Sequence, residues 1–100
     1  MAMNKNKDKP VLMFFYREIH QEGVSTFNQL RGENPLIASF ITVNVQENPE
    51  VAKTFSIEYT PTLLVVINGK EYWRHVGGFT PEYIKNNLAL FEPINREAFL

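Results

Sequence analysis

The stretch Thr60-Pro61-Thr62-Leu63-Leu64-Val65-Val66-Ile67 decides the fold of this chain. Proline has no N–H to donate to a sheet, so within sheets it is found at the first residue of a strand or on an edge. The aliphatic run after Thr62, which ends at the turn residues Asn68-Gly69, predicts a strand covered on both faces. Pro61 therefore marks the start of a central strand, and the rest of the chain must supply the cover.

The composition indicates one small globular domain. The chain has 100 residues, of which 44% are apolar and 21% are charged, and its net charge is −1. This length is enough for a single modest core, and the composition is not that of a disordered chain. Because the chain has no basic field, we expect neither nucleic acid nor a membrane as a partner.

Cysteine is absent from the sequence. Its absence removes disulfides, thiolate nucleophiles, cysteine-based zinc sites and iron–sulfur clusters. The apolar stretch Val11–Tyr16 is shorter than the core of a signal peptide and lacks a small-residue cleavage site, and no stretch reaches transmembrane length. We therefore expect a cytoplasmic protein.

The chain is expected to begin with a strand and a loop. Residues 1–9 have no periodicity and are predicted to form a flexible lead-in. Val11–Tyr16 is a second apolar run with high strand propensity, and we expect it to pair beside the Leu63 strand. Residues 17–23 should leave this strand as a polar loop.

A helix and an edge strand are predicted next. Val24, Phe27 and Leu30 recur at helical spacing, and Gly32 is a natural C-terminal stop. Residues 37–46 alternate between apolar and polar positions, which predicts a half-buried edge strand parallel to the first. The apolar positions of this strand are Ile41, Val43 and Val45.

Turn and cap signals divide the second half of the chain. Asn48-Pro49-Glu50 and Thr80-Pro81-Glu82 each combine a cap, a proline and an acidic residue, as at the start of a helix. Asn68-Gly69 predicts a two-residue hairpin turn, after which Lys70–Val76 returns antiparallel and ends at Gly77-Gly78. The core face of the last helix is expected to comprise Tyr83, Ile84, Leu88 and Phe91, and residues 93–100 should form a C-terminal tail.

These motifs resemble, in their order and spacing, those of the thioredoxin superfamily. The resemblance is carried by Asn48-Pro49-Glu50-Val51-Ala52, Tyr59-Thr60-Pro61-Thr62-Leu63, Asn68-Gly69-Lys70 and Val76-Gly77-Gly78. It implies an α/β fold, thioredoxin-like, with a trimmed core β-α-β-α-β-β-α and a four-stranded mixed sheet flanked by helices.

The resemblance also implies the limits of the domain and the geometry of its proline. The thioredoxin-like domain should span residues 10–92, and Pro61 should follow a cis peptide bond and face the loop after the first strand. Thioredoxins usually begin with an extra strand and helix, for which residues 1–9 are too short. The domain is therefore expected to be trimmed to the size of a glutaredoxin.

The sequence departs from the family pattern at the residues that carry out the family's redox chemistry. The Cys-x-x-Cys motif of the family falls on His20, Gln21, Glu22 and Gly23, and the position of its buried acid falls on Phe14. Thiol–disulfide exchange requires a thiolate that attacks a disulfide, which neither imidazole nor glycine replaces. We therefore expect a redox-inactive protein that is not an enzyme.

The remaining candidates for chemistry are few. His20 with Glu22 as its orienting partner could act as a general base, but an exposed polar loop is the simpler interpretation, because no converging third group is evident. His75, the other histidine, is expected on the far hairpin strand, so we predict no metal site and no cofactor. Tyr72, Trp73 and Arg74 beside it are expected to be core or cross-strand residues.

The favoured hypothesis is a module that binds an unidentified protein or extended peptide. A cis-proline loop offers backbone N–H and C=O groups that pair with an added strand, and this function needs no cysteine. By resemblance, the binding groove would comprise Tyr16, Ile19, His20, Tyr59, Thr60, Pro61, Val76 and Gly77.

Two alternatives stay open. The first is a structural or self-associating subunit, for example a homodimer, because the strand at residues 37–46 would leave an unpaired edge. The second is a glutathione-binding enzyme that uses the hydroxyl group of Tyr16 or Thr60 in place of sulfur. A transferase of that type normally has a second helical domain, so this alternative rests on analogy alone.

Overall fold

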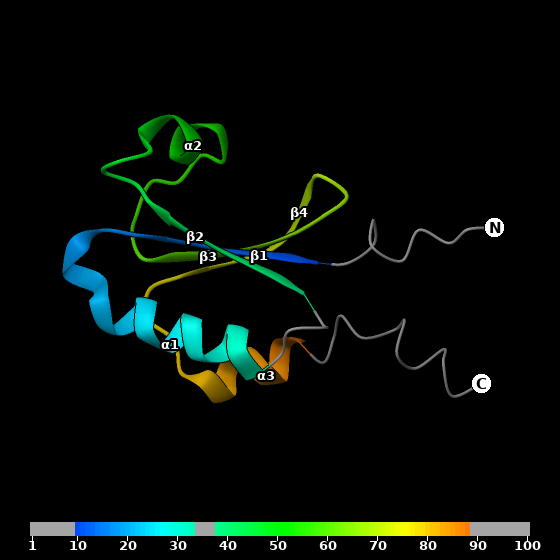
Figure 1. Ribbon diagram of the computed structural model, residues 1–100. Helices are drawn as coiled ribbons and strands as arrows, with labels where there is room; N and C mark the ends of the chain where they lie inside the picture. Colours follow the sequence, from blue (N-terminus) through cyan, green and yellow to red (C-terminus); the bar gives the residue numbers. More distant parts are fainter. Residues whose placement is uncertain (1–9, 34–37, 89–100) are drawn as a thin grey trace.

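The computed structural model describes residues 10–33 and 38–88, and shows a four-stranded mixed sheet between two layers of helices (Figure 1). Helices α1 and α3 cover one face of the sheet, and α2 covers the other. No helix in these two ranges is long and apolar enough to cross a membrane. The elements are β1 (Val11–Tyr16), the 3₁₀ helix η1 (Glu18–His20), α1 (Gln21–Glu33), β2 (Ser39–Asn44), α2 (Pro49–Thr54), β3 (Thr62–Ile67), β4 (Lys70–Val76) and α3 (Pro81–Leu88).

The sheet has the strand order β2-β1-β3-β4, with β1 and β3 at its centre. Phe14 of β1 pairs in parallel with Thr42 of β2 and antiparallel with Leu63 of β3. Leu63 and Leu64, which point to opposite faces, are both fully buried. The predicted α/β fold, the covered central strand after Pro61 and the neighbouring strand are thereby confirmed.

Each face of the sheet has its own apolar core. Phe14 and Leu63 lie in the core beneath α1 and α3, whereas Phe15 and Leu64 lie in the core beneath α2. Each large apolar side chain that is fully buried contributes about 1.5–3 kcal/mol to folding. Alternate side chains of β1 and β3 serve the two cores in turn, which is why these strands carry uninterrupted apolar runs.

The predicted turn and one predicted helix cap have the expected geometry. Asn68 and Gly69 both have positive φ, at 54° and 81°, as a type I′ turn requires. The Thr80 hydroxyl accepts a hydrogen bond from the Tyr83 N–H at 3.1 Å, so Thr80 caps α3. Asn48 stands at the N-cap of α2, but its side chain donates instead to the backbone oxygen of the residue that ends β2.

Two predictions around α1 are wrong. Residues 17–23 do not form an open loop, because η1 begins at Glu18 and α1 at Gln21. The helix also continues through Gly32 to Glu33, because Gly32 does not adopt the left-handed conformation that would end it. The polar composition of this segment reflects an exposed helix start and not an absence of helix.

The predicted core faces of β2 and α3 need correction. Ile41 is exposed, because the short helix α2 covers Val43 but does not extend over the start of β2. The neighbouring Phe40, on the opposite face of the strand, packs against the core beneath α1. Tyr83 is also exposed, whereas Ile84 is buried as expected. The side chains of Leu88 and Phe91, and the predicted lead-in and tail, lie outside the described residues.

Helix α2 ends in a turn whose backbone N–H groups hydrogen-bond to two carbonyl groups of the helix. The Ser56 N–H donates to Lys53 O at 3.0 Å, and the Ile57 N–H donates to Ala52 O at 2.9 Å. This pair of hydrogen bonds defines a Schellman motif, whose left-handed residue is usually glycine. Here it is Ser56, with φ of 55°.

We expect Ser56→Gly to raise the free energy of unfolding by about 0.5–1 kcal/mol, because a Cβ in the left-handed region is unfavourable and glycine has none. Urea denaturation measures the change. The control is Ser56→Ala, which keeps the Cβ and should bring no gain. Equal stability of the glycine and alanine variants would contradict the prediction.

Candidate functional site

The loop that leads into β3, residues 59–62, is partly held by hydrogen bonds. The Thr60–Pro61 peptide bond is cis. Tyr59 O accepts a hydrogen bond from the Thr62 hydroxyl at 2.6 Å, and Pro61 O accepts one from the Gly77 N–H at 2.8 Å. Within residues 10–33 and 38–88, we find no hydrogen-bond partner for the backbone N–H or C=O of Thr60. The loop is thus held at Tyr59 O and Pro61 O, while both main-chain groups of Thr60 are unpaired in these ranges.

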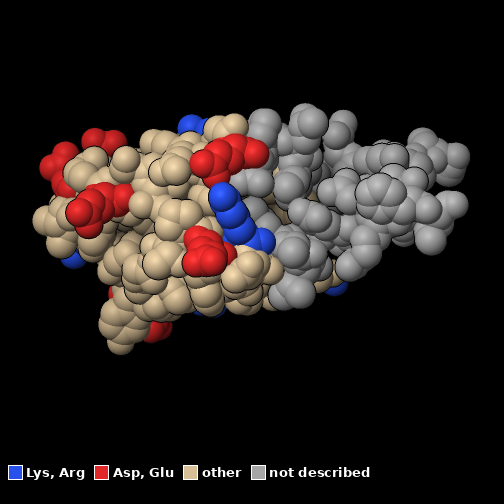
Figure 2. Space-filling view, turned by 90° about the horizontal axis from the view of Figure 1, so that it is seen from below, with Lys and Arg blue, Asp and Glu red and all other residues tan. Residues whose placement is uncertain are grey.

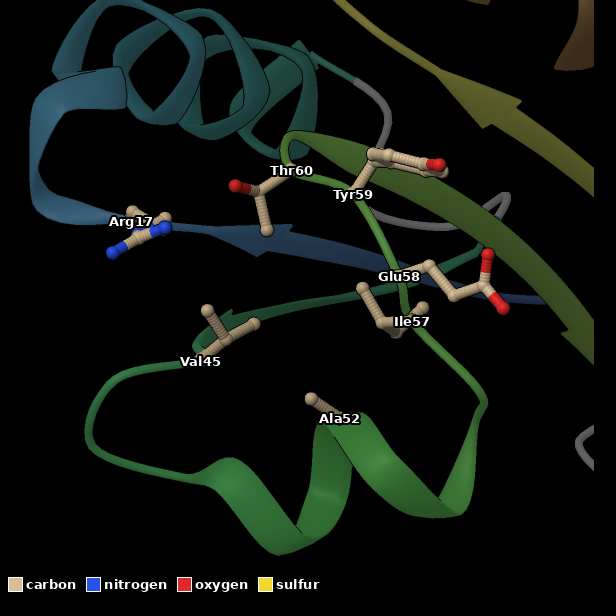
Figure 3. Close-up of a pocket in the computed structure, with 7 residues that line it drawn as sticks. All are labelled: Arg17, Val45, Ala52, Ile57, Glu58, Tyr59 and Thr60. Atoms are coloured by element: carbon tan, nitrogen blue, oxygen red, sulfur yellow. The ribbon is translucent and has the colours of Figure 1, made fainter.

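A first hollow of about 340 Å³ lies between this loop and α2. Figure 3 shows Val45, Ala52 and Ile57 turned toward one another, while Arg17 and Thr60 lie on the other side of the space. The hollow therefore has an apolar floor and a polar rim, and its volume is at the lower end of the range for small binding sites. Its full lining is Arg17, Val45, Ala52, Ile57, Glu58, Tyr59 and Thr60.

A second hollow, also of about 340 Å³, lies between the loop and β4. It is lined by Ser56, Glu58, Tyr59, Thr62, Arg74 and Val76. Since Glu58 and Tyr59 line both hollows, these two residues separate them. Together the hollows flank the unpaired backbone of the loop on two sides.

Arg74 forms one wall of the second hollow and is held in place by several partners. Its guanidinium donates to Phe55 O at 2.8 Å and to Ser56 O at 3.1 Å, at the C-terminal end of α2. It also forms an ion pair with Glu71 at 2.8 Å, and this hydrogen bond lowers the pKa of the Glu71 carboxyl group. Arg74 therefore ties β4 to α2 and fixes the wall beside the loop.

Three of the groove residues that the sequence suggested are large exposed apolar side chains. Ile19 is 83% exposed, Tyr59 66% and Val76 52%. They belong to three separate segments, namely η1, the loop before β3 and the end of β4. Single exposed apolar side chains are common on protein surfaces, so these three do not by themselves define a binding surface.

The other suggested groove residues have different positions. Tyr16 is half-buried and stacks on Phe14 at 6.0 Å, in the core beneath α1, so its ring faces away from the first hollow. Pro61 and Gly77 hydrogen-bond to each other through their backbones and support the loop. Thr60 lines the first hollow, as does Tyr59.

Sequence reasoning missed most of the apolar floor. Val45 directly follows β2, Ala52 belongs to α2, and Ile57 lies in the connection between α2 and β3, so no local pattern connects them. The alternation of residues 37–46 predicted that Val45 faces the same side as Val43, which was the one available signal. Arg17 and Glu58 gave no signal at all.

His20 has a structural role in this site. Its Nδ1 accepts a hydrogen bond from the Arg17 N–H at 3.1 Å, and its own N–H donates to Arg17 O at 2.8 Å, so it closes η1 as a capping residue. Gln21 donates to Glu18 O at 3.0 Å in the same turn. Glu22 is exposed and makes no hydrogen bond to His20, and no cluster of metal-ligating residues is found in the described ranges. The pair lacks the geometry of a base and its orienting partner.

His75, on the edge strand β4, has a comparable role. Its ring lies 4.8 Å from that of Tyr83 and 6.2 Å from that of Trp73, and its Nε2 is 2.8 Å from Gly78 O. It thereby fixes the bend that follows β4, next to the Gly77 that bonds to the loop.

Gly23 lies directly against Phe14. A Cβ at position 23 would be 2.8 Å from Phe14 Cζ, closer than real Cβ atoms come to other heavy atoms. The Phe14 ring is itself fixed by stacking on Phe27 and by an edge contact with Phe79. The two departures from the family pattern, at positions 14 and 23, are therefore parts of one packing arrangement.

Comparison with known proteins agrees with this architecture. The thioredoxin family model matches residues 3–89, so the chain belongs to the thioredoxin family. Among solved structures it is similar to a thioredoxin from Fasciola hepatica, with a TM-score of 0.76 and 23% sequence identity over 88% of this chain and 86% of that one. No curated protein sequence matches the chain. The fold and the family predicted from the sequence are confirmed.

We expect Gly23→Ala to lower the free energy of unfolding by about 1–2 kcal/mol. Alanine in a helix is normally favoured over glycine by about 1 kcal/mol, but overpacking against the fixed Phe14 ring outweighs this gain. Urea denaturation measures the effect. Gly32→Ala is the matched control, because a Cβ there meets nothing within 4 Å and should stabilise α1.

The contact between Phe14 and Gly23 also predicts that a smaller side chain at position 14 relieves the destabilisation caused by Gly23→Ala. Adding Phe14→Leu to Gly23→Ala should cost less stability than the two single changes summed, because the shorter side chain makes room for the new Cβ. Additive effects of the two substitutions would contradict direct contact between positions 14 and 23.

Proposed function

We propose that this protein is a redox-inactive thioredoxin-like module that binds an extended peptide segment of another protein at the loop of residues 59–62. The observation that carries the proposal is the unpaired backbone N–H and C=O of Thr60 between two hollows. An extended segment that pairs with these groups gains main-chain hydrogen bonds and places its side chains in the hollows.

Two features support the redox-inactive part of the proposal. The chain has no cysteine with which to form a mixed disulfide. In addition, Phe14 and Gly23 pack where the family has its buried acid and second cysteine, and this packing leaves no space for a side chain at position 23. The site is thus stabilised as an apolar contact between α1 and the sheet.

The proposal is tested by nuclear magnetic resonance with a library of short peptides and, separately, with glutathione. We expect peptides, and not glutathione, to shift the amide signals of Tyr59 and Thr60. Tyr59→Ser should weaken the effect, whereas Tyr72→Ser, which removes an aromatic side chain that is 61% exposed on β4, should not. Shifts with glutathione alone would favour the enzyme alternative, and reduction of insulin disulfides by the protein would contradict the proposal.

Self-association through β2 is the second candidate, and the exposed Ile41 on this strand favours it. Ser39 and Val45 donate their N–H groups toward β1, so the intervening Phe40, Thr42 and Asn44 direct theirs to the outer edge. Two carbonyls on that edge are already occupied. Phe40 O accepts from Arg31 Nη2 at 3.0 Å, and Asn44 O accepts from the Asn48 N–H at 2.9 Å. This partial closure makes the edge a weaker candidate than the loop.

We expect the wild-type chain to sediment as a monomer and Arg31→Ala to increase the dimer fraction, because it frees the Phe40 carbonyl. Analytical ultracentrifugation over a concentration series measures the fraction. Lys53→Ala, which removes a positive charge from α2, is the control. A dimer of the wild-type chain at low concentration would favour the second candidate instead.

A further inference from the structure

Exposed glutamates gather at the end of the molecule that carries the loop. Figure 2 shows, on the face of α1 and α3, acidic side chains near the end where α1 begins. The Glu18 N–H donates to Gln46 Oε1 at 3.2 Å, which places η1 against the connection between β2 and α2. The glutamates at this end are Glu18 in η1, Glu22 in the first turn of α1, Glu47 before α2, Glu50 in the first turn of α2, and Glu58, which directly precedes the loop.

None of these carboxylates is neutralised by an ion pair within residues 10–33 and 38–88. The two ion pairs in these ranges lie elsewhere, between Arg74 and Glu71 and between Lys85 and Glu33. Because the whole chain has a net charge of only −1, the acidity is local to this end and not a property of the surface in general. A surface on which negative charge predominates raises the local concentration of ligands of the opposite sign.

Among these glutamates, Glu58 is the one that lines the hollows. It lines both hollows beside Tyr59, and its carboxylate accepts no hydrogen bond within the described ranges. Arg74 is the cation that lines the second hollow with it, and the pKa of Arg74 is raised by its hydrogen bond to Glu71 and, to a lesser extent, by the charge of Glu58. The hydrogen bonds of the guanidinium nevertheless go to Glu71 and to the carbonyls of the two residues that directly follow α2. Glu58 therefore retains its capacity to bind a cation from a ligand.

Arg17 distinguishes the two ends of the first hollow. It is the cation among the residues that line this hollow, and it lies across the space from Ile57 and Glu58 (Figure 3). A basic group on the ligand is thus favoured on the Glu58 side and disfavoured on the Arg17 side. The apolar floor of the hollow accepts an aliphatic side chain between the two.

We propose that the ligand is an extended, basic segment of a partner protein, with an aliphatic side chain in the first hollow and a lysine or arginine at Glu58. This inference rests on the proposed function and adds the chemical class of the ligand. Main-chain pairing at Thr60 provides affinity for any extended segment, and the carboxylates select among such segments by charge.

The test uses short synthetic peptides with a common central leucine whose neighbours are all lysine, all glutamine or all glutamate. Fluorescence anisotropy at low salt measures the dissociation constant of each peptide. We expect the lysine peptide to bind at least about fivefold more tightly than the glutamine peptide, and the glutamate peptide to bind most weakly. The difference should shrink at high salt, because the charges are exposed.

Two variants test whether Glu58 is responsible for the preference for lysine. Glu58→Gln should reduce the preference for lysine about two- to fivefold, whereas Glu82→Gln, which removes an exposed carboxylate from the first turn of α3, should not change it. Equal binding of the lysine and glutamine peptides, or an unchanged preference in Glu58→Gln, would overturn the inference and leave the proposed function standing. No shift of the Tyr59 and Thr60 amide signals with any of the peptides would overturn both.

Discussion

Burial of the central pair of strands, β1 and β3, on both faces is the constraint on which the rest of the structure depends. Their side chains serve two separate cores, so the sheet is stable only when helices cover both of its faces. Helix α1 therefore follows β1 and covers one face, α2 follows β2 and covers the other, and the chain then returns to start β3. The loop of residues 59–62 lies where these connections meet, which places it at a fixed end of the sheet.

The loop is supported by β4 and by the residues that directly follow it. Arg74 ties β4 to the end of α2, and His75 fixes the bend at Gly78. Gly77 then donates to Pro61 O across the end of the sheet. These contacts hold the loop in one conformation, while the backbone N–H and C=O of Thr60 have no partner among the described residues. A loop that is already ordered loses less entropy when it binds a ligand.

The contact between Phe14 and Gly23 changes how the departures from the family pattern are understood. Along the sequence, the apolar residue in β1 and the glycine in α1 are two separate departures from the family pattern. In the structure they touch, because the Phe14 ring fills the space into which a side chain at position 23 would project. The helix start is therefore stabilised by close packing of a ring on a glycine, and His20 caps the turn before it.

The sequence alone determined the elements whose signals are local. Pro61 with its aliphatic run predicted β3, Asn68-Gly69 predicted the turn, and Thr80-Pro81 predicted the start of α3, because each depends on backbone preferences of a few neighbouring residues. Only the tertiary structure decided the rest. The floor of the first hollow joins residues from three segments, and the end of α1 and the exposure of Ile41 depend on which element lies above them. Packing between segments distant in sequence fixes these features, and no local preference encodes such packing.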